Sequence, residues 1–547
     1  MKRLAMFAGV LALVVVGGFL LFKNYAYYLP GIIGNIRDPI APYHDVAWAQ
    51  GPAEEQNGER PPNVIVILAD DLGFNDISFN GGGVGAGLVQ TPNIDALAHE
   101  GVAVTQAYAG NATCSPSRAA IMTGRYPTRF GFEFTSAPQA FSRYLSHATP
   151  GALRQPIFHE ERVAAVPPLD QLGLPPGETT IAEVMRARGY HTMHIGKWHL
   201  GEAAEMRPEA QGFDESLGFM AGAAMYMAPN DPGVVNAELP FDPIDRFLWA
   251  NLPYAVQWNG QQRFRPRGYI TDYFTDQAVA AIEANRNRPF FLYLAYNAVH
   301  TPLQASRADY DALSAIPDHT ERVYGAMVTA LDRGVGRIMQ ALRDQGVDDN
   351  TLVIFTSDNG GAWYVGLPHI NAPFRGWKAT FFEGGVRTPF FARWPRHLPA
   401  GARIEGPATH MDIFATAEAA SGAPHSANID GVNLLPYLEG HDSGAPHQTL
   451  YWRSGPYRSV RDGDWKLQVS ETPDRVWLFN LRDDPTEQHD LSASEPERVA
   501  AMRAMIEAQN ANTPPPIWPA LLEGPVRIDV PLNAPWSEDQ EYIYWSN

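Results

Sequence analysis

The residue best suited to chemistry in this chain is a cysteine. Cys114 is the only cysteine among 547 residues, and it opens the pentapeptide Cys-Ser-Pro-Ser-Arg at positions 114–118. A lone thiol cannot form a disulfide within the chain, and one thiolate is too few for a cysteine-based zinc site. Cys114 is therefore either a reactive side chain or a small buried apolar residue, which is the usual role of a free cysteine.

The residues after Cys114 predict a helix that begins there. Ser115 and Pro116 are typical of a first helical turn, and Ala119–Met122 continue the helical pattern. Position 114 is thus expected at a helix N-terminus, where free N–H groups and the helix dipole attract an anion such as sulfate. Arg118 lies one turn further along and could reach back to such an anion, although a lone helix arginine is more often solvated.

A second group of polar side chains could hold a metal ion. Asp70 and Asp71 follow the apolar run at 64–69, and Asp358 and Asn359 follow another apolar run. Their side chains offer only oxygen ligands, which suit a hard cation such as calcium or magnesium. Either pair alone is explained equally well by a turn or a helix cap. Two such pairs, each placed after a predicted strand, favour the metal.

Two lysines and two histidines could bind an anion and move protons. Lys197 and His199 lie in Gly-Lys-Trp-His at 196–199, His300 follows a strongly apolar run, and Lys378 ends Gly-Trp-Lys at 376–378. A lysine is most often a surface residue, and a lone histidine most often has a structural role. A Gly-flanked segment can bring a lysine close to an anion, and a histidine beside metal ligands is suited to acid–base chemistry.

The elements that must position these residues alternate between apolar strands and amphipathic helices from residue 63 onward. Expected strands are 64–69, 102–108, 191–195, 289–296 and 351–356, and expected helices are 92–98, 180–188, 272–285 and 321–342. This pattern predicts an α/β fold whose large, mostly parallel or mixed sheet is covered by helices on both faces. Because ligands bind beyond the carboxyl ends of such strands, the polar clusters should converge at one edge.

The pattern changes near residue 445. Short strands around tight turns follow, such as 457–460 and 465–469, and a helix is expected near 495–508. Beyond it lies a tail rich in Pro and Trp whose fold the pattern does not predict. We therefore expect a catalytic domain over 63–445 and a smaller antiparallel α+β subdomain with its tail over 446–547.

The N-terminus begins with a hydrophobic segment. Residues 4–22 carry no charge and follow Lys2 and Arg3, which predicts that residues 1–23 are a membrane anchor, with a cleaved signal peptide as the alternative. Either would place the rest of the chain in a periplasm or outside the cell. Residues 24–62, with their Gly-Pro and Pro-Pro pairs, are predicted to be a tether. The formal net charge of −19 argues against nucleic acid as a partner.

Two motifs together resemble one enzyme family. The Cys-x-Pro-x-Arg pentapeptide with Thr-Gly-Arg at 123–125 is similar to the signature of the type I, arylsulfatase-like sulfatases, and Gly-Lys-Trp-His-Leu-Gly at 196–201 is similar to the second signature of that family. The similarity spans about residues 63–395 and extends into the C-terminal subdomain through 457–467 and 478–485. It implies the alkaline-phosphatase-like fold of that family and hydrolysis of a sulfate ester.

The resemblance also implies a maturation step and a metal. Cys114 would be oxidised to formylglycine by a formylglycine-generating enzyme, and the hydrate of this aldehyde would be the nucleophile. Calcium, with magnesium as the alternative, would be bound by five residues: Asp70, Asp71, Asp358, Asn359 and the modified Cys114. Five further residues would hold the sulfate and handle protons: Arg118, Lys197, His199, His300 and Lys378.

Other functions and substrates remain open from the sequence. A phosphonate monoester or phosphodiester hydrolase can use the same formylglycine, and a chain with unmodified Cys114 would only bind sulfate esters. The substrate is expected to be a small-molecule or saccharide sulfate ester. Four aromatic residues near the predicted site, Trp198, Trp363, Tyr364 and Trp377, either form a wall for its ring or belong to the core.

Overall fold

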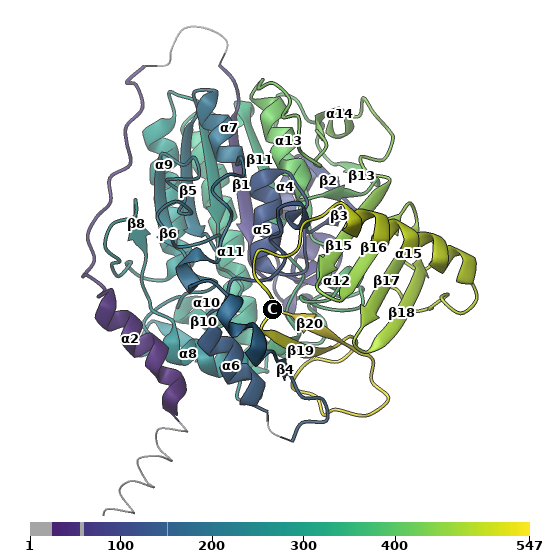
Figure 1. Cartoon of the computed structure of the whole chain (residues 1–547). Coiled ribbons are helices and arrows are strands. Elements are labelled where there is room, and N and C mark those ends of the chain that lie inside the picture. The colour runs from purple at the N-terminus through teal and green to yellow at the C-terminus, as the bar shows by residue number, and fades with distance from the viewer. Residues whose placement is uncertain (1–24, 55–59, 150) are drawn as a thin grey trace, which may run out of the picture.

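A nine-stranded mixed sheet forms the centre of the computed structural model, which describes residues 25–54, 60–149 and 151–547 (Figure 1). Its strands run in the order β13-β2-β12-β11-β1-β9-β5-β6-β8. Their bounds are β1 Asn63–Ala69, β2 Val102–Val104, β5 His191–Lys197, β6 Glu215–Phe219, β8 Gln257–Trp258, β9 Phe290–Ala295, β11 Thr351–Ser357, β12 Phe390–Arg393 and β13 Ala402–Ile404.

The middle of the sheet is parallel. β1 pairs in parallel with both β11 and β9, and β9 pairs in parallel with β5, so the carboxyl ends of these four strands lie next to one another. All seven residues of β1 are buried, as expected for a strand covered on both faces. Antiparallel β12 and β8 lie nearer the edges. This arrangement confirms the predicted α/β class.

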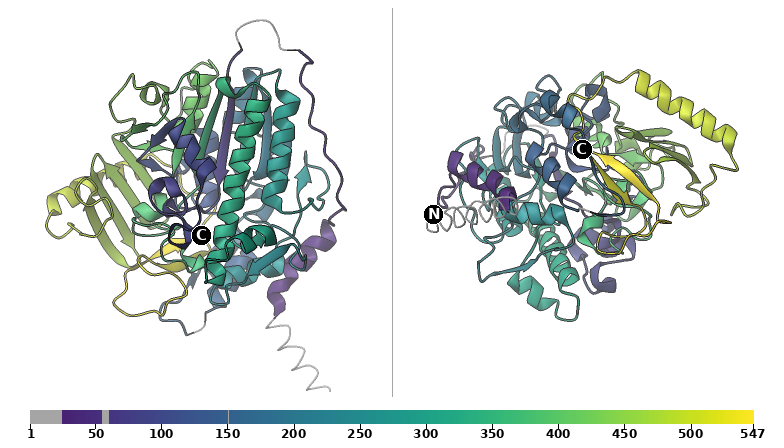
Figure 2. Two further views of the ribbon diagram at one scale, coloured as in Figure 1. Left: turned by 180° about the vertical axis from the view of Figure 1, so that it is seen from behind. Right: turned by 60° about the horizontal axis from the view of Figure 1, so that its bottom comes forward.

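Helices cover both faces of the sheet. The helices α5 (Cys114–Thr123), α7 (Ile181–Ala187) and α13 (Met411–Ala420) pack with Val64, Val66 and Leu68 on one face. On the other face, α4 (Pro92–His99), α9 (Ile270–Asn285) and α11 (His319–Asp344) pack with Ile65 and Ile67, and Figure 2 shows α11 running along the sheet. The alternation of side chains along β1 thus divides the core into two layers.

Several predicted elements differ in detail from the structure. The strand expected at 102–108 is two short strands, β2 and β3 (Ala107–Tyr108). His300 does not close β9, because that strand ends at Ala295 and a loop carries the chain further. This loop bonds back to the end of β1, through Tyr296 N–H to the Leu68 carbonyl at 2.9 Å and Val299 N–H to the Asp70 carbonyl at 2.8 Å. These bonds place His300 beside the end of β1.

An antiparallel sheet forms the C-terminal part, as predicted. It contains β15 (Thr449–Ser454), β16 (Tyr457–Asp462), β17 (Trp465–Glu471) and β18 (Asp474–Asn480), and α15 (Pro496–Ala511) packs on it. A buried ion pair joins this sheet to the catalytic domain, where Lys466 Nζ lies 2.7 Å from Glu383 Oε1. The boundaries expected at residues 62 and 445 remain predictions.

The tail returns to the catalytic domain. β19 (Leu522–Arg527) pairs with β20 (Tyr542–Ser546) and with the two-residue strand β4 (Ile157–Phe158). Figure 1 shows this small sheet beyond the carboxyl end of the large one. The tail is therefore part of the surface near the predicted site.

Shorter elements complete the described chain. The strands β7 (Val234–Ala237) and β10 (Leu303–Ser306) form a two-stranded sheet, and β14 (Ala408–Thr409) pairs with β3. The remaining helices are α2 (Leu29–Arg37), α3 (Val84–Gly87), α6 (Gln139–His147), α8 (Pro243–Asn251), α10 (Arg307–Ala312), α12 (Glu383–Val386) and α14 (Leu435–Leu438), together with several short 3-10 turns.

The localisation expected from the sequence is corrected here. Within residues 25–54, 60–149 and 151–547, no helix has the length and apolar character needed to span a bilayer. The anchored periplasmic or extracellular placement is therefore withdrawn. The segment on which it rested, residues 1–23, lies outside the described residues.

Candidate active site

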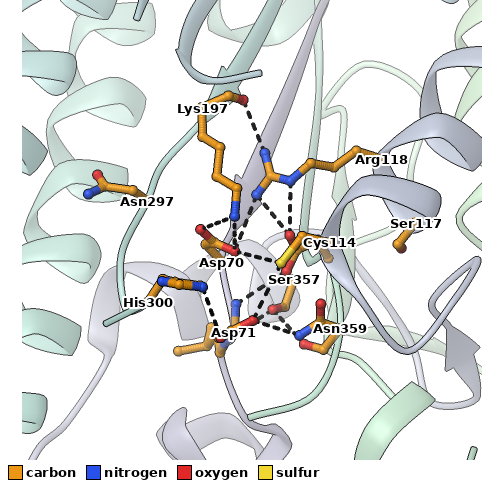
Figure 3. A network of polar contacts seen from close by, with 12 residues as sticks. Asp70, Asp71, Cys114, Ser117, Arg118, Lys197, Asn297, His300, Ser357 and Asn359 are labelled. Atoms are coloured by element: carbon orange, nitrogen blue, oxygen red, sulfur yellow. Dashed lines mark hydrogen bonds and ion pairs between the residues drawn. The ribbon is translucent and has the colours of Figure 1, made fainter. Parts of the chain in front are cut away.

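Most of the predicted polar residues meet at one edge of the sheet (Figure 3). Asp70 and Asp71 follow β1, Lys197 is the last residue of β5, and Asp358 and Asn359 follow β11. Since β11, β1, β9 and β5 are neighbours, their ends bring these side chains together without any long loop. The topology argument made from the sequence is thus confirmed for these positions.

Cys114 is the first residue of α5 and lies in the middle of this cluster. Its Sγ is 3.3 Å from Lys378 Nζ, 3.5 Å from Asp70 Oδ1 and 3.8 Å from Asp71 Oδ1. The side chain is 2% exposed, and every residue of α5 is buried. The predicted helix N-terminus is confirmed, and the packed helix fixes the position of residue 114.

Arg118 and Lys197 hold two of the carboxylates. Arg118 Nε lies 2.9 Å from Asp358 Oδ2, and its Nη2 lies 2.8 Å from the same oxygen. Lys197 Nζ lies 2.9 Å and 2.7 Å from the two oxygens of Asp70. Burial nevertheless raises the pKa of Asp70 to about 7, against the effect of Lys197 and Arg118. Burial therefore opposes ionisation of Asp70 even beside two positive side chains.

Lys378 holds the third carboxylate. Its Nζ lies 2.7 Å and 2.8 Å from the two oxygens of Asp71, and it also donates to the Tyr364 hydroxyl at 3.1 Å. The Tyr364 hydroxyl in turn donates to Asp71 Oδ2 at 2.9 Å. With every ionisable member of the three pairs charged, three negative carboxylates face three positive side chains, so the cluster is neutral.

The oxygen-rich part of this cluster fits a hard divalent cation. Asp70, Asp71, Cys114 and His300 can each present one ligand atom, and these atoms lie within 4.8 Å of one another. Asn359 donates from Nδ2 to Asp71 Oδ1 at 2.8 Å, while its buried Oδ1 has no hydrogen-bond partner among the described residues. A buried amide oxygen without a partner is costly, and a cation would satisfy it.

Asp358 has a different environment from Asp70 and Asp71. Its Oδ1 accepts the Asp71 N–H at 3.2 Å, and its Oδ2 is held by Arg118. Burial opposes its ionisation, but Arg118, Lys197 and Lys378 hold the pKa of Asp358 well below its usual range. Such a carboxylate is a permanent anion, which suits it to holding cations better than to accepting a proton.

The two histidines differ in their contacts with the cluster. His300 Nδ1 donates to the Thr301 carbonyl at 2.6 Å, so Nε2 faces Asp71 Oδ2 at 3.7 Å. Burial lowers the pKa of His300 to about 3, although Asp71 opposes this shift. His199 Nε2 contacts the Ser136 carbonyl at 3.1 Å, and the described part of the chain gives it no hydrogen bond to the cluster.

The four aromatic residues divide into two pairs. Trp198 and Trp377 are 0% and 4% exposed and belong to the core. Tyr364 contacts the cluster directly. The partly exposed Trp363 packs against the Tyr364 ring, with the two ring centroids 5.0 Å apart. The sequence placed Tyr364 near the site because it lies six residues after Asp358, but nothing in the pattern predicted its hydroxyl contacts.

Sequence reasoning also missed Tyr226, which supports the loop of His300. Its hydroxyl donates to the carbonyl of His300 at 2.9 Å and to the carbonyl of Asn297. The Tyr226 N–H donates to Gln304 Oε1 at 2.8 Å, on the far side of the same loop. No sequence signal could have found this residue, because its partners are backbone atoms of a distant segment.

The sulfatase family model matches residues 62–423, which is well over half of the chain. The chain belongs to the sulfatase family. This sulfatase is 34% identical over 427 residues to N-acetylgalactosamine-6-sulfatase of Mus musculus, which covers 75% of this chain and 72% of the relative. It is also 30% identical over 559 residues to steryl-sulfatase of Homo sapiens, and this match covers 84% of this chain and 89% of the relative.

A solved structure is similar in both sequence and fold. The crystal structure of Ps i-CgsB in complex with k-i-k-neocarrahexaose is 32% identical, covers 84% of this sulfatase and 95% of its own chain, and has a TM-score of 0.68. The type I sulfatase resemblance and the alkaline-phosphatase-like fold are therefore confirmed, and the sulfatase is a sulfuric ester hydrolase.

Replacing Arg118 tests the charge pairing within the site. Arg118→Leu leaves Asp358 buried without its partner, so we expect a loss of about 3–5 kcal/mol in the free energy of unfolding. The control is Arg129→Leu, which breaks the more exposed pair with Asp430 (2.8 Å) and should cost less than about 1 kcal/mol. Urea unfolding of both variants measures the difference, and equal losses would contradict the pairing.

Proposed function

We propose that this sulfatase hydrolyses a saccharide sulfate ester by means of a formylglycine made from Cys114, with calcium bound beside it. One observation carries the proposal. The Cys114 side chain begins a buried helix and lies 3.3 Å from Lys378 Nζ and 3.5 Å from Asp70 Oδ1. A nucleophile at this position would have anion-binding groups and candidate metal ligands within contact distance.

The unmodified thiol is a poor nucleophile at this position. Burial raises the pKa of Cys114, Asp358 adds to the shift, and Lys197 and Lys378 do not offset it. The reactive thiolate is therefore scarce at neutral pH. Oxidation of Cys114 would replace the thiol by an aldehyde, whose hydrate supplies a hydroxyl for attack on sulfur.

A cation would be held by the oxygen atoms of Asp70, Asp71, Asp358 and Asn359 together with the group at position 114. When bound, it would stabilise negative charge on the sulfate oxygens. The oxygen-only ligands and the family favour calcium, with magnesium as the alternative. Two added positive charges would make the neutral cluster positive, which suits an anionic sulfate ester.

The positive side chains of the site have separate tasks in this proposal. Arg118 stays on Asp358 and completes the positive wall of the site. Lys197 and Lys378 have flexible stems, so their ammonium groups can turn from the carboxylates to the oxygens of a sulfate group. These positive charges would offset negative charge that develops on the sulfate oxygens during reaction.

Proton transfer falls to Lys378 and the two histidines. Lys378 can donate a proton or a hydrogen bond to the departing alcohol. His300 presents the lone pair of a neutral Nε2 to the site as an acceptor, because its Nδ1 hydrogen is donated to the Thr301 carbonyl. His199, which has an unpartnered buried Nδ1 among the described residues, is proposed as the second acceptor.

Cys114→Ala should abolish turnover of 4-nitrophenyl sulfate while leaving the thermal unfolding temperature nearly unchanged, since only one sulfur atom is removed from a packed site. Mass spectrometry of the wild-type peptide that contains residue 114 should give the mass of the aldehyde, which is lighter than the thiol. Retained activity in Cys114→Ala, or only the thiol mass in active enzyme, would contradict the formylglycine.

Removal of the cation should inactivate the enzyme. After chelation with EDTA and desalting, we expect kcat/KM to fall by at least about 100-fold, because charge stabilisation by a cation contributes several kcal/mol. Added calcium should restore activity more fully than magnesium. Unchanged activity in the chelated enzyme would exclude the cation from the reaction.

The substrate class is tested with a panel of esters. The saccharide proposal rests on similarity to an N-acetylgalactosamine-6-sulfatase and to Ps i-CgsB with its bound neocarrahexaose. We expect sulfated mono- and oligosaccharides to have higher kcat/KM than steroid sulfates. The reverse order would reject the saccharide, and faster hydrolysis of a phenyl phosphonate than of nitrophenyl sulfate would favour a phosphonate hydrolase.

A further inference from the structure

Tyr364 links two parts of the site that have different tasks in the proposed reaction. Its hydroxyl donates to Asp71 Oδ2 at 2.9 Å and accepts from Lys378 Nζ at 3.1 Å. The residue is 3% exposed, so water cannot easily take its place. A single neutral oxygen atom thus contacts a candidate metal ligand and a candidate sulfate-binding lysine at the same time.

The backbone that carries Tyr364 is held from outside the catalytic domain. Tyr364 lies in the 3-10 turn Trp363–Val365, which ends at Gly366 with a φ of +83°. In the tail, the Leu532 N–H donates to the Trp363 carbonyl at 3.0 Å, and Asn533 Nδ2 donates to the Gly366 carbonyl at 3.0 Å. Both ends of the turn are therefore fixed, and the hydroxyl has a defined position.

The position of Lys378 shows why such a hydroxyl is useful. In the structure its ammonium group rests mainly on the two oxygens of Asp71. A cation on Asp71 would compete for these oxygens, and a long lysine side chain released from its partner regains rotamer freedom, so its ammonium group would no longer have one position. The Tyr364 hydroxyl offers an acceptor that the cation does not remove.

We propose that Tyr364 is a positioning residue of this sulfatase, an inference that rests on the proposed function. Its O–H fixes the carboxylate of Asp71 in the orientation that binds the cation, as partners of metal-ligating carboxylates do. Its oxygen lone pair holds one N–H of Lys378, which leaves the other N–H groups free to meet the sulfate ester. Tyr364 itself does not contact the reacting bond.

The test compares Tyr364→Phe with Tyr190→Phe. Both variants remove one buried hydroxyl that donates to an oxygen acceptor, and the Tyr190 hydroxyl bonds the Pro62 carbonyl at 2.8 Å, at the opposite end of β1. Tyr364→Phe also removes an acceptor of Lys378, but without calcium that lysine keeps both oxygens of Asp71. Three quantities are measured for each variant and for wild type: kcat and KM for the best sulfate ester, the calcium affinity of chelated enzyme from the rise in unfolding temperature, and the unfolding temperature without calcium.

We expect Tyr364→Phe to weaken calcium binding and to lower kcat/KM, each by about 10–100-fold. Its unfolding temperature without calcium should match that of Tyr190→Phe, whose calcium affinity and kinetics should equal those of wild type. A general loss of stability would lower the unfolding temperatures of both variants by the same amount, and it would leave the calcium affinity of Tyr364→Phe unchanged.

The possible failures are distinct. Suppose that wild type is active and binds calcium, and that Tyr364→Phe equals Tyr190→Phe in calcium affinity and in kcat/KM. The positioning role is then wrong, while the proposed function stands. If wild type hydrolyses no sulfate ester, the proposed function fails, and the calcium titration of Tyr364→Phe still decides whether Tyr364 orients Asp71. A wild-type enzyme that does not respond to calcium overturns both.

Discussion

The balance of buried charge at the carboxyl edge of the sheet is the constraint on which this structure depends. Asp70, Asp71 and Asp358 are at most 3% exposed, and an ionised carboxylate in such a place is strongly unfavourable without a partner. Each is paired with one positively charged side chain. These side chains are Arg118 on α5, Lys197 at the end of β5 and Lys378 in the loop after β11. These elements must therefore keep their relative positions for any of them to be stable.

The same balance explains how the site can be stable before a cation binds. Asp71 is in contact with Lys378, Tyr364 and Asn359, so all of its acceptor capacity is used. In the proposed function, a cation would therefore bind by an exchange of partners, in which the ammonium group of Lys378 would leave Asp71 and become available to an anionic substrate. Such an exchange would couple the binding of the metal to the binding of the sulfate ester.

Local patterns were sufficient to predict the elements that carry the site. The apolar runs of β1 and β11 and the helical start at Cys114 have strong signals in a few consecutive residues, and the parallel topology rule brings their ends together. The family motifs then added the roles of Lys197 and Lys378, whose residue types alone would favour the surface. Burial of both lysines in the structure agrees with their placement in the cluster.

What could not be predicted depends on contacts between distant segments. β4 has two residues and no pattern of its own, and β19 contains Pro525, so neither resembles a strand until they pair. His300 and Tyr364 are fixed by backbone bonds to β1 and to the tail. Such contacts form only in the assembled fold, and they cannot be predicted from a short stretch of sequence because their partners are far apart in the chain.

The pairing of β4 with β19 has a consequence for the order of events during synthesis. Every member of the charge cluster has been synthesised once the chain reaches Lys378. The large sheet is complete once β13 (Ala402–Ile404) has followed. The partner of β4 and the two tail residues that hold the Tyr364 turn, Leu532 and Asn533, are made much later. A growing chain therefore contains every residue of the charge cluster before it contains the tail residues that hold the Tyr364 turn, so those contacts can form only after the rest of the site has been synthesised.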